Sequence, residues 1–404
     1  MNHHQPKLKI VAALIAGITL FPAFAPAADI AIPTVILKQG VASNAVPLFS
    51  TSPSLQTGLA LRAQVGDGDG PGSEPTFTSA NFNLPLWQQF SNIAFGGPVA
   101  GAPQYIEAGV IYAEPGRSAA ATGEFVRLGL STVGTPIGTY PLALSATDIG
   151  ADTTFLATGG ALVPTTIANG QTLVYGTSLS IPANTTNAVA YSPLSSTSLT
   201  VSGKLRVAPN SGTSVVSTLS VTGSGFVDLT DNDLIVRGTS VAAVRNLVAQ
   251  WRTASSGLPG SVGLGSSLSF YSAEGAFTTL AVYDNSIAGQ TRTTFNGIAV
   301  SPSDVLVKYT YLGDTNLDGA VNATDIARIL QGMNGQGTGW NFGDVNYDGA
   351  INALDLGRAM AALRGQGAPL AGSNLGGAGG GAIPEPASLA PMLAAAALLE
   401  RRRR

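Results

Sequence analysis

The chain has 404 residues, only 11% of them charged, and its formal net charge is −3. Nucleic-acid binding needs clustered Lys and Arg, so we expect no nucleic-acid partner. The chain has no Cys, and its two His residues, His3 and His4, lie at the extreme N-terminus. Zinc sites built on Cys or His, and nucleophiles that need a His base, are therefore not expected in the rest of the chain.

The first 27 residues have the pattern of a secretory signal peptide. Lys7 and Lys9 supply positive charge, residues 10–24 are apolar, and residues 25–27 (Ala-Pro-Ala) offer small side chains for cleavage. The apolar run is shorter than the roughly 20 residues of a membrane-spanning helix. We therefore predict that residues 1–27 direct export and are then removed.

Residues 28–310 have the pattern of a β protein. Short runs rich in Val, Leu, Thr and Phe are separated by Gly, Pro, Asn and Ser, and frequent turn residues favour antiparallel β-sandwiches. We divide this region into a β-sandwich-like domain (28–175) and a second β-rich module (176–310). In the second module, apolar residues at helical spacing predict one helix near residues 240–252.

Two short runs in the β region resemble known families. Residues 138–148 (GTYPLALSATD) resemble the late strands of cohesin-like or carbohydrate-binding sandwiches. Residues 227–236 (VDLTDNDLIV) resemble a module found ahead of dockerin-like repeats in secreted planctomycete proteins. The first resemblance implies a sandwich fold, and the second implies no known activity.

The strongest pattern is an internal repeat, in which residues 313–325 (GDTNLDGAVNATD) recur as residues 343–355 (GDVNYDGAINALD). Counted from the first Asp, oxygen-bearing side chains stand at positions 1, 3, 5 and 12, and Gly stands at position 6. This is the ligand spacing of an EF-hand calcium loop, with Asp in place of the last Glu and a backbone carbonyl at position 7. The predicted ligands of two calcium ions are Asp314, Asn316, Asp318, Ala320 and Asp325 in the first loop, and Asp344, Asn346, Asp348, Ala350 and Asp355 in the second.

Each loop is followed by apolar residues at helical spacing, but a strand-like run (305–312) precedes the first loop where an EF-hand has a helix. Loop and exiting helix, duplicated within residues 311–367, resemble a type I dockerin. The resemblance implies a small α-helical domain with two calcium loops, which docks onto a cohesin-like or other surface protein. Type I dockerins contact cohesin through loop positions 10–11 and helix positions 17–18, the latter often a basic pair. This chain has Ala323-Thr324 with Leu330-Gln331, and Ala353-Leu354 with Met360-Ala361, so the basic pair is missing. We expect Leu330 and Met360 to face the core of the domain.

The C-terminus carries a second targeting pattern. After a Gly-rich linker (368–383), Pro384-Glu385-Pro386 precedes an apolar run (387–399) and four terminal Arg residues. This order resembles the PEP-CTERM sorting signal, which implies recognition by exosortase-type machinery and placement in the cell envelope or outside the cell. At about 1.5 Å per residue the apolar run is short for a hydrocarbon core of about 30 Å, so we expect transient or weak anchoring.

The sequence favours a non-catalytic surface protein, which would be structural, adhesive or partner-docking, over an enzyme. The alternative is a part in extracellular polysaccharide breakdown, as a carbohydrate-binding protein or as a glycoside hydrolase, which needs only a pair of carboxylates. Asp231 and Asp233 could face one way on a strand, although their flanking residues favour a turn. Acidic residues scattered through the β region include Glu74, Glu107, Glu114, Glu124, Asp148, Asp152, Asp228, Asp231, Asp233, Glu274 and Asp284.

Overall fold

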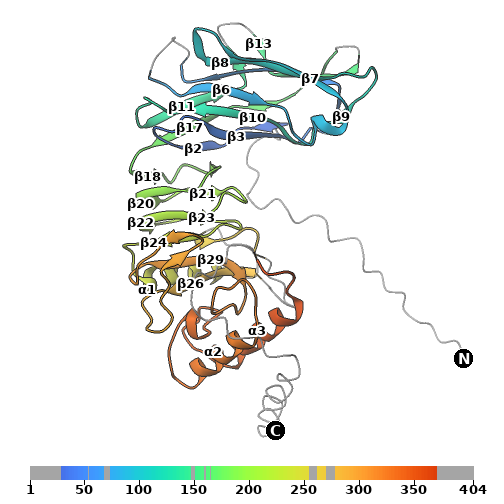
Figure 1. Ribbon diagram of the computed structural model, residues 1–404. Helices are drawn as coiled ribbons and strands as arrows, with labels where there is room; N and C mark the ends of the chain where they lie inside the picture. Colours follow the sequence, from blue (N-terminus) through green and yellow to red (C-terminus); the bar gives the residue numbers. More distant parts are fainter. Residues whose placement is uncertain are drawn as a thin grey trace, which may run out of the picture. The chain divides into compact units, whose positions relative to one another are not determined.

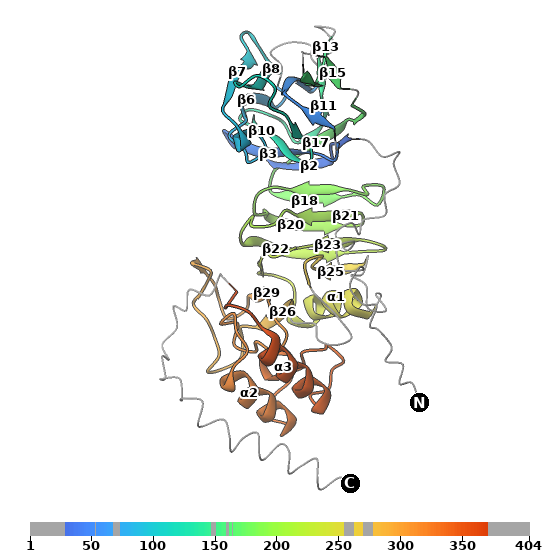
Figure 2. The same ribbon diagram turned by 90° about the vertical axis from the view of Figure 1, so that its right-hand side faces the viewer.

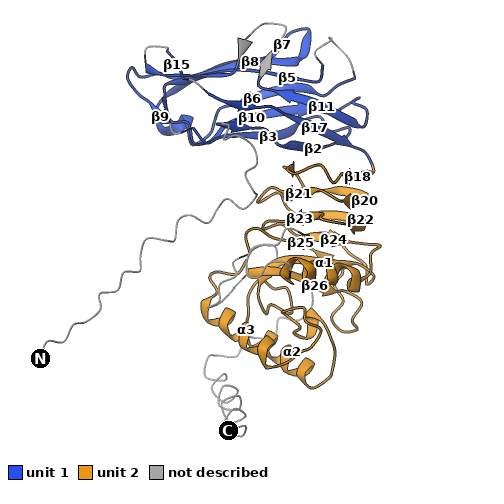
Figure 3. Ribbon diagram, turned by 180° about the vertical axis from the view of Figure 1, so that it is seen from behind, with its two compact units in different colours: residues 1–176 blue, residues 177–404 orange. Residues whose placement is uncertain are grey.

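The computed structural model of the protein describes residues 29–52, 54–67, 73–146, 151–158, 161–163, 165–253, 262–269 and 278–370. The predicted signal peptide, most of the Gly-rich linker and the PEP-CTERM-like segment lie outside the described residues. The chain divides into two compact units, residues 1–176 and residues 177–404, which Figure 3 distinguishes by colour. In the described part of the chain, every helix is too short or too polar to cross a membrane.

Unit 1 contains two main sheets whose strands are mostly antiparallel. The strands of the first, in the order β16-β1-β3-β10-β6, are Ile167–Ala168, Ile30–Ala31, Asn44–Ser50, Gly123–Ser131 and Thr76–Asn81. Those of the second, in the order β15-β14-β5-β11-β17-β2, are Leu162–Val163, Thr154–Leu156, Gly58–Val65, Gly138–Ala143, Gly170–Tyr175 and Thr34–Lys38. Strand β8 (Ala102–Tyr112) pairs with β5 and with β7 (Asn92–Val99). Short pairs are β4 (Leu55–Gln56) with β9 (Ala119–Ala120), and β12 (Ser145–Ala146) with β13 (Ala151–Asp152).

Buried aromatic side chains join the two sheets of unit 1. Phe125 of β10 meets Phe155 of β14 edge to face, with ring centroids 5.5 Å apart. Trp87, in the short helix η1 (Trp87–Gln89), is fully buried and donates from Nε1 to the Phe125 carbonyl. Figure 2 shows β6, β10 and β3 on one side of the unit and β11 and β17 on the other. This arrangement is the antiparallel β-sandwich expected of the first domain.

Unit 2 begins with a stack of parallel coils (Figures 1 and 2). Hydrogen bonds between neighbouring coils join residues that are 20 apart, such as Thr197 Oγ1 to the Thr177 carbonyl and Ser202 Oγ with Thr222 Oγ1. One parallel sheet contains β18 (Ser178–Ile181), β20 (Ser195–Val201), β22 (Ser214–Val221) and β24 (Leu234–Val236). The other contains β19 (Ala188–Ala190), β21 (Lys204–Val207), β23 (Phe226–Asp228) and β25 (Gly263–Gly265).

The parallel strands correct the antiparallel arrangement that the turn residues had led us to expect for this module. Gly, Ser and Asn fit the corners between successive coils as well as they fit hairpin turns. Alternating apolar residues show which face of a strand is buried, but they do not show the direction of its neighbour. The class of the fold, mainly β followed by a small helical domain, is confirmed.

Antiparallel strands and helices complete unit 2. Strand β29 (Val305–Tyr311) pairs antiparallel with β24 and with the edge strand β26 (Thr278–Asp284). Helix α1 (Val241–Thr253) lies where the helical spacing predicts a helix. A hairpin of β27 (Thr294–Phe295) and β28 (Ile298–Ala299) precedes β29. The remaining elements are α2 (Ala323–Met333), the short helix η4 (Trp340–Phe342) and α3 (Ala353–Gly365).

Candidate metal centre

The first predicted loop gathers three carboxylates. It follows β29 directly, without an entering helix, and ends in the first turn of α2. Asp314 and Asp325 are fully buried, and one oxygen of each lies within 4.8 Å of the other and of an oxygen of the half-buried Asp318. Burial and the neighbouring carboxylates raise the pKa of Asp314 to about 7 and that of Asp325 to about 6. A bound cation would relieve this repulsion, so the donor set fits a hard divalent ion.

Backbone N–H groups hold the predicted ligands of the first loop in place. Asp318 N and Gly319 N donate to the two carboxylate oxygens of Asp314, at 3.0 and 2.9 Å. Asn322 N donates to Asp325 Oδ2 at 2.9 Å, so Asp325 caps α2 while its other oxygen accepts from the loop backbone. Gly319 has a φ of 88°, and a Cβ there would lie 2.5 Å from the Leu370 carbonyl oxygen. The sharp turn at position 6 therefore requires glycine.

Residues after α3 cover the first loop. Gln366 accepts from Val321 N at 2.7 Å and donates to the Val321 carbonyl at 2.6 Å. Leu370 N donates to the Gly319 carbonyl at 2.9 Å. The remaining predicted ligands of this loop, Asn316 and Ala320, are half-buried. The first loop is thus enclosed by its own chain.

The second loop repeats the backbone of the first but is more open. Asp344 and Asp355 are buried, Asn346 is half-buried, and Asp348 and Ala350 are exposed. Burial raises the pKa of Asp344 and of Asp355, and each also lies near another carboxylate. Within the described ranges, only the first loop brings three acidic side chains within the distance given above.

One buried oxygen distinguishes the second loop. Asp344 Oδ1 is buried and has no hydrogen-bond partner among the described residues, although buried polar atoms normally have one. The positive charge of Arg245, on α1, acts on this carboxylate and lowers its pKa against the effect of burial. A cation held by the second loop would supply the missing partner.

The two loops pack reciprocally on each other's helices. A Cβ added to Gly313 would lie 2.6 Å from Ala359 Cβ on α3, and one added to Gly343 would lie 2.5 Å from Ile329 Cγ1 on α2. Both glycines have positive φ, 111° and 104°. Because each loop supports the helix that leaves the other, the two loops form one folding unit.

Sequence reasoning missed the residue that links the two loops. Trp340 is fully buried, and its Nε1 donates to the carbonyl of Asp314 at 2.8 Å. Its ring stacks on Tyr347 of the second loop, with centroids 5.6 Å apart and planes 26° apart. A lone Trp between two calcium loops gives no sequence signal of such a role beyond its size.

The second loop also binds the edge of the β sheet. The Tyr347 hydroxyl donates to the Leu280 carbonyl and accepts from Val282 N, both at 2.8 Å. The Asn341 side chain accepts from Asp284 N at 2.8 Å and donates to the Asp284 carbonyl at 3.1 Å. These backbone groups belong to β26, which lies beside the helical domain in Figure 1. The helical domain therefore completes the sheet of unit 2.

The positions that resemble the cohesin-contacting residues of dockerins lie at the surface. Thr324 and Gln331 are exposed, and Leu354 is 52% exposed. Leu330 and Met360, which we expected in the core, are half-buried. At these positions the helical domain thus presents uncharged polar and apolar side chains.

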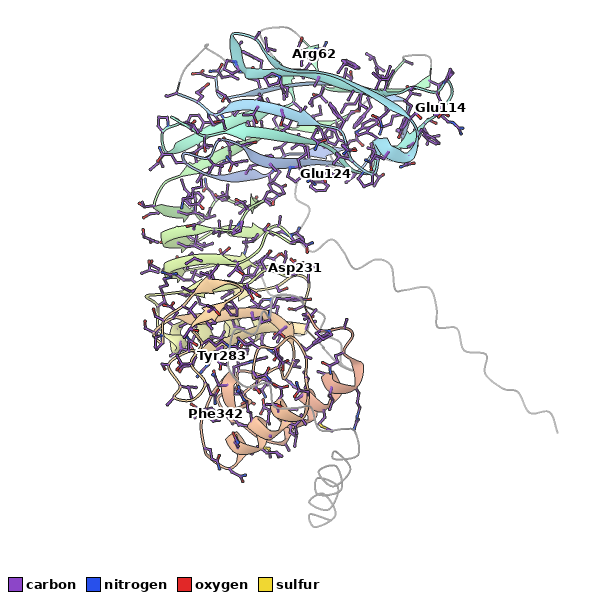
Figure 4. All side chains as sticks on the ribbon, in the orientation of Figure 1. Arg62, Glu114, Glu124, Asp231, Tyr283 and Phe342 are labelled. Carbon is purple, nitrogen blue, oxygen red and sulfur yellow. The ribbon has the colours of Figure 1, made fainter. Side chains whose placement is uncertain are left out.

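The carboxylates of unit 1 bind to nearby arginines. The ion pairs are Glu107 with Arg62, Glu114 with Arg117 and Glu124 with Arg127, at 3.2, 3.0 and 2.7 Å. Figure 4 shows Arg62, Glu114 and Glu124 on separate parts of the unit. Glu74 accepts from Asp67 N. Each of these carboxylates therefore has a local partner.

The carboxylates of unit 2 outside the loops also have local partners. Asp231 (labelled in Figure 4) accepts from Asn210 N, whereas Asp233 is buried beside Lys308. They lie in and after a turn before β24, as expected, and each contacts a different partner. Asp228 accepts from Thr230 N and Ser267 N, and Asp284 from Ser286 N. Asp148 and Glu274, and the side chain of Asp152, lie outside the described residues.

Comparison with known proteins agrees with the repeated loop and helix. The chain matches the model of the Dockerin type I domain over residues 312–363. The paired loops, each followed by a helix, define a small calcium-loop module. Residues 312–363 form such a module, a type I dockerin domain. No curated protein matches the chain.

Solved structures that are similar to the chain include several cohesins. A non-cellulosomal cohesin from Archaeoglobus fulgidus is 13% identical, with 36% of this chain and 89% of that chain covered and a TM-score of 0.27. The sixth cohesin of scaffoldin B from Acetivibrio cellulolyticus, solved with a dockerin, is 12% identical, with coverages of 37% and 100% and a TM-score of 0.28. The seventh ScaB type I cohesin from Pseudobacteroides cellulosolvens is 17% identical, with coverages of 37% and 92% and a TM-score of 0.25. Similarities this low say nothing about function.

Proposed function

We propose that this protein is an exported docking protein of the cell surface, whose dockerin domain binds two calcium ions and then a partner protein. The observation that carries the proposal is the first loop, where backbone donors hold three carboxylates within 4.8 Å. Charges this close, two of them buried, destabilise the cation-free loop. Calcium prefers oxygen ligands, and the residues present offer them.

In each loop the side chains at positions 1, 3, 5 and 12 would hold the ion. In the first they are Asp314, Asn316, Asp318 and Asp325, joined by the carbonyl of Ala320. The equivalent residues, 30 positions later, would serve the second loop. Bound calcium would fix both loops and, through their reciprocal packing, the relative position of α2 and α3. That effect makes docking dependent on calcium.

Isothermal titration of the full chain with calcium tests the first step. We expect a stoichiometry near two, and we expect the double variant Asp318→Ala, Asp348→Ala to lose both sites. Arg237→Met, which leaves both loops unchanged, is the control. Absence of calcium binding by the unmodified chain would contradict the proposal.

Two exposed surfaces are available to a partner. On the dockerin domain, Leu354 is exposed beside the second loop. On unit 1, a row of apolar side chains crosses neighbouring strands, because Ile93 stands opposite Ile111 and Leu156 opposite Leu162. Ile93 is 54% exposed and Leu162 is 68% exposed. Apolar surface of this kind is typical of protein interaction sites.

Calcium-dependent binding to immobilised proteins tests the docking step. The full chain is passed over a type I cohesin and over a second immobilised copy of itself, with calcium and then with a chelator. We expect binding to one of the two in calcium alone, and we expect Leu354→Asp to weaken it at least about tenfold, or about 1.4 kcal/mol. Equal binding with and without calcium would refute calcium-dependent docking.

The local pairing of the carboxylates in the β units supports a non-catalytic role. We therefore expect the purified full chain to release no sugar from common polysaccharides with calcium present. Export and sorting rest on the terminal sequences, and mass spectrometry of envelope-associated protein tests them. We expect an N-terminus near residue 28 and loss of the terminal Arg cluster, and an intact Arg404 would count against processing.

A further inference from the structure

A buried lysine lies in the middle of the sheet of unit 2. Lys308, on β29 between β24 and β26, is 1% exposed. Among the described residues, its ammonium group has a single hydrogen-bond partner, Asp233 Oδ2 at 3.4 Å. An ammonium group carries three donors, and lysine is almost never fully buried without strong pairing. One long hydrogen bond is poor compensation for this burial.

Asp233 connects the lysine to a third side chain. It stands opposite Lys308, because Leu234 pairs with Val307 on the neighbouring strand. Its Oδ2 also receives the side-chain amide of Asn296, at 2.6 Å. The amine and the amide therefore approach the same carboxylate oxygen. Burial raises the pKa of Asp233, which suits this carboxyl group to accept and return a proton.

The position of Asn296 is fixed by a tight turn. Asn296 and Gly297 have φ values of 50° and 79° and join β27 to β28, as Asn-Gly does in two-residue hairpins. The Asn296 amide also donates to Thr213 Oγ1 at 2.8 Å, and within the described part of the chain its Oδ1 is buried without a partner. The hairpin thus holds an amide against the Lys308–Asp233 pair.

We propose that Lys308 and Asn296 join in an intramolecular isopeptide bond, with Asp233 transferring the protons. The ammonium of Lys308 gives a proton to Asp233, and the neutral Nζ attacks Cγ of Asn296. As the Cγ–Nδ2 bond breaks, Asp233 passes this proton and then a second proton from Nζ to the departing nitrogen, which leaves as an ammonium ion. A lysine ammonium group and a primary amide thus become a secondary amide and an ammonium ion, and Asp233 ends as it began. The reaction needs no oxidant and no other reagent.

The surroundings favour this reaction over a simple ion pair. Asn296 is only half-buried, so ammonia has a route to solvent. The bond would replace a poorly paired buried charge by a neutral amide, which costs less in an apolar site. It would also tie the hairpin to the inner strand β29 in a chain that has no cysteine for disulfides.

Mass spectrometry of the purified full chain tests the proposal. We expect the protein to be lighter than its sequence by about 17 Da, the mass of ammonia. After proteolysis, a branched peptide should join the segment that contains Lys308 to the segment that contains Asn296. Lys308→Met and Asn296→Gly should each remove the branched peptide, and Asn296→Gly keeps the positive φ of the turn. Lys204→Met, at the partly exposed lysine of β21, is the matched control and should keep the branched peptide.

Any outcome other than these would overturn the proposal. An unmodified mass would do so, and so would a branched peptide that persists in Lys308→Met. A loss of the same mass confined to a linear peptide would indicate a succinimide at Asn296-Gly297. Circular dichroism of each variant separates failure to fold from failure to cross-link, and Asp233→Asn in a folded chain should leave the two segments unjoined.

Discussion

The two loops of the dockerin domain share a sequence pattern but not an environment. In the first loop, Asp314 accepts from two backbone N–H groups and from the Thr310 hydroxyl, and the residues after α3 cover the turn. In the second, Asp344 Oδ1 is buried and finds no hydrogen-bond partner in the residues that the structure describes, and Asp348 is exposed. The motif thus determines which atoms can bind an ion, whereas the neighbouring elements determine how well those atoms are arranged before it arrives.

Helix α1 accounts for much of the difference. Arg252 Nη1 donates to the Val345 carbonyl at 3.0 Å, and the guanidinium of Arg245 lies against Gly339. A Cβ on Gly339 would lie 2.1 Å from Arg245 Nη2, and the Gly339 carbonyl accepts from Asp344 N. A positive charge beside a cation site opposes binding. We therefore expect the first loop to bind calcium more tightly than the second.

Removing the last predicted ligand of each loop should change calcium binding more than any other substitution considered below. Asp325→Ala deletes both a predicted ligand and one member of the capping box of α2, so we expect calcium binding at the first loop to weaken at least about 100-fold, or about 2.8 kcal/mol. Asp355→Ala should produce the same defect at the weaker site and leave the tighter one intact. Titration calorimetry of the full chain measures both, and loss of the tighter site in Asp355→Ala would reverse our assignment.

The hydroxyl of Tyr347 tests the attachment of the second loop to the sheet. Tyr347→Phe leaves Leu280 O and Val282 N of β26 unpaired, which should lower the free energy of unfolding by about 2 kcal/mol. Tyr309→Phe is the matched control, because its hydroxyl bonds to Leu268 and Thr278 nearer to solvent. Loss of the Tyr309 hydroxyl should lower the free energy of unfolding by less than about 0.5 kcal/mol. Denaturant unfolding in calcium compares the two variants.

The raised pKa values of the first loop predict a dependence on pH. Asp314 and Asp325, at about 7 and about 6, bind protons in competition with calcium. Calcium affinity at this loop should therefore fall about 15-fold from pH 7.5 to pH 6.

Without calcium, low pH has the opposite effect, because it stabilises the folded protein. The raised folded pKa values contribute stability that is present at low pH and is lost as pH rises through about 6 to 7. The chelated protein should thus unfold more easily at pH 8 than at pH 5.5. Thermal unfolding with calcium and with chelator would show these opposite trends, and parallel trends would contradict the assignment.

Removing the positive charge beside the second loop should give the smallest effect. Arg245→Met keeps the stem of the side chain and deletes its charge, so we expect calcium affinity of the second loop to rise about fivefold, near 1 kcal/mol. Arg237→Met is the control, because that guanidinium bonds to the Ala299 carbonyl instead. Unchanged affinity in Arg245→Met would show that burial, and not this charge, separates the two loops.

The sequence was most informative where function depends on local spacing. The ligands of an EF-hand-like loop lie within twelve residues, so the repeat in residues 313–325 and 343–355 can be recognised from the sequence alone. The dockerin domain, the mainly β class and the turn at Asp231 followed from similarly local patterns. Side chains that act at a distance left no such signal. Arg245 and Arg252 reach the second loop from almost a hundred residues earlier in the chain, as the 93-residue separation of Arg252 and Val345 shows.

The parallel coils were missed for a related reason. Their 20-residue spacing is maintained by pairs such as Ser202 with Thr222 and Lys204 with the Ser224 carbonyl. Ser and Thr are so common in this chain that such pairs do not stand out as a repeat. The direction of neighbouring strands depends on these contacts between coils and not on the composition of any one strand.

The attachment of Tyr347 and Asn341 to β26 also bears on how the protein stays apart from its neighbours. An edge strand with open N–H and C=O groups is a template on which another chain can add a strand. Here the second loop occupies that template with side chains, which cannot be extended into a further strand. If the protein binds calcium as we propose, bound calcium would help to keep this edge covered, whereas calcium depletion would free the edge and invite aggregation.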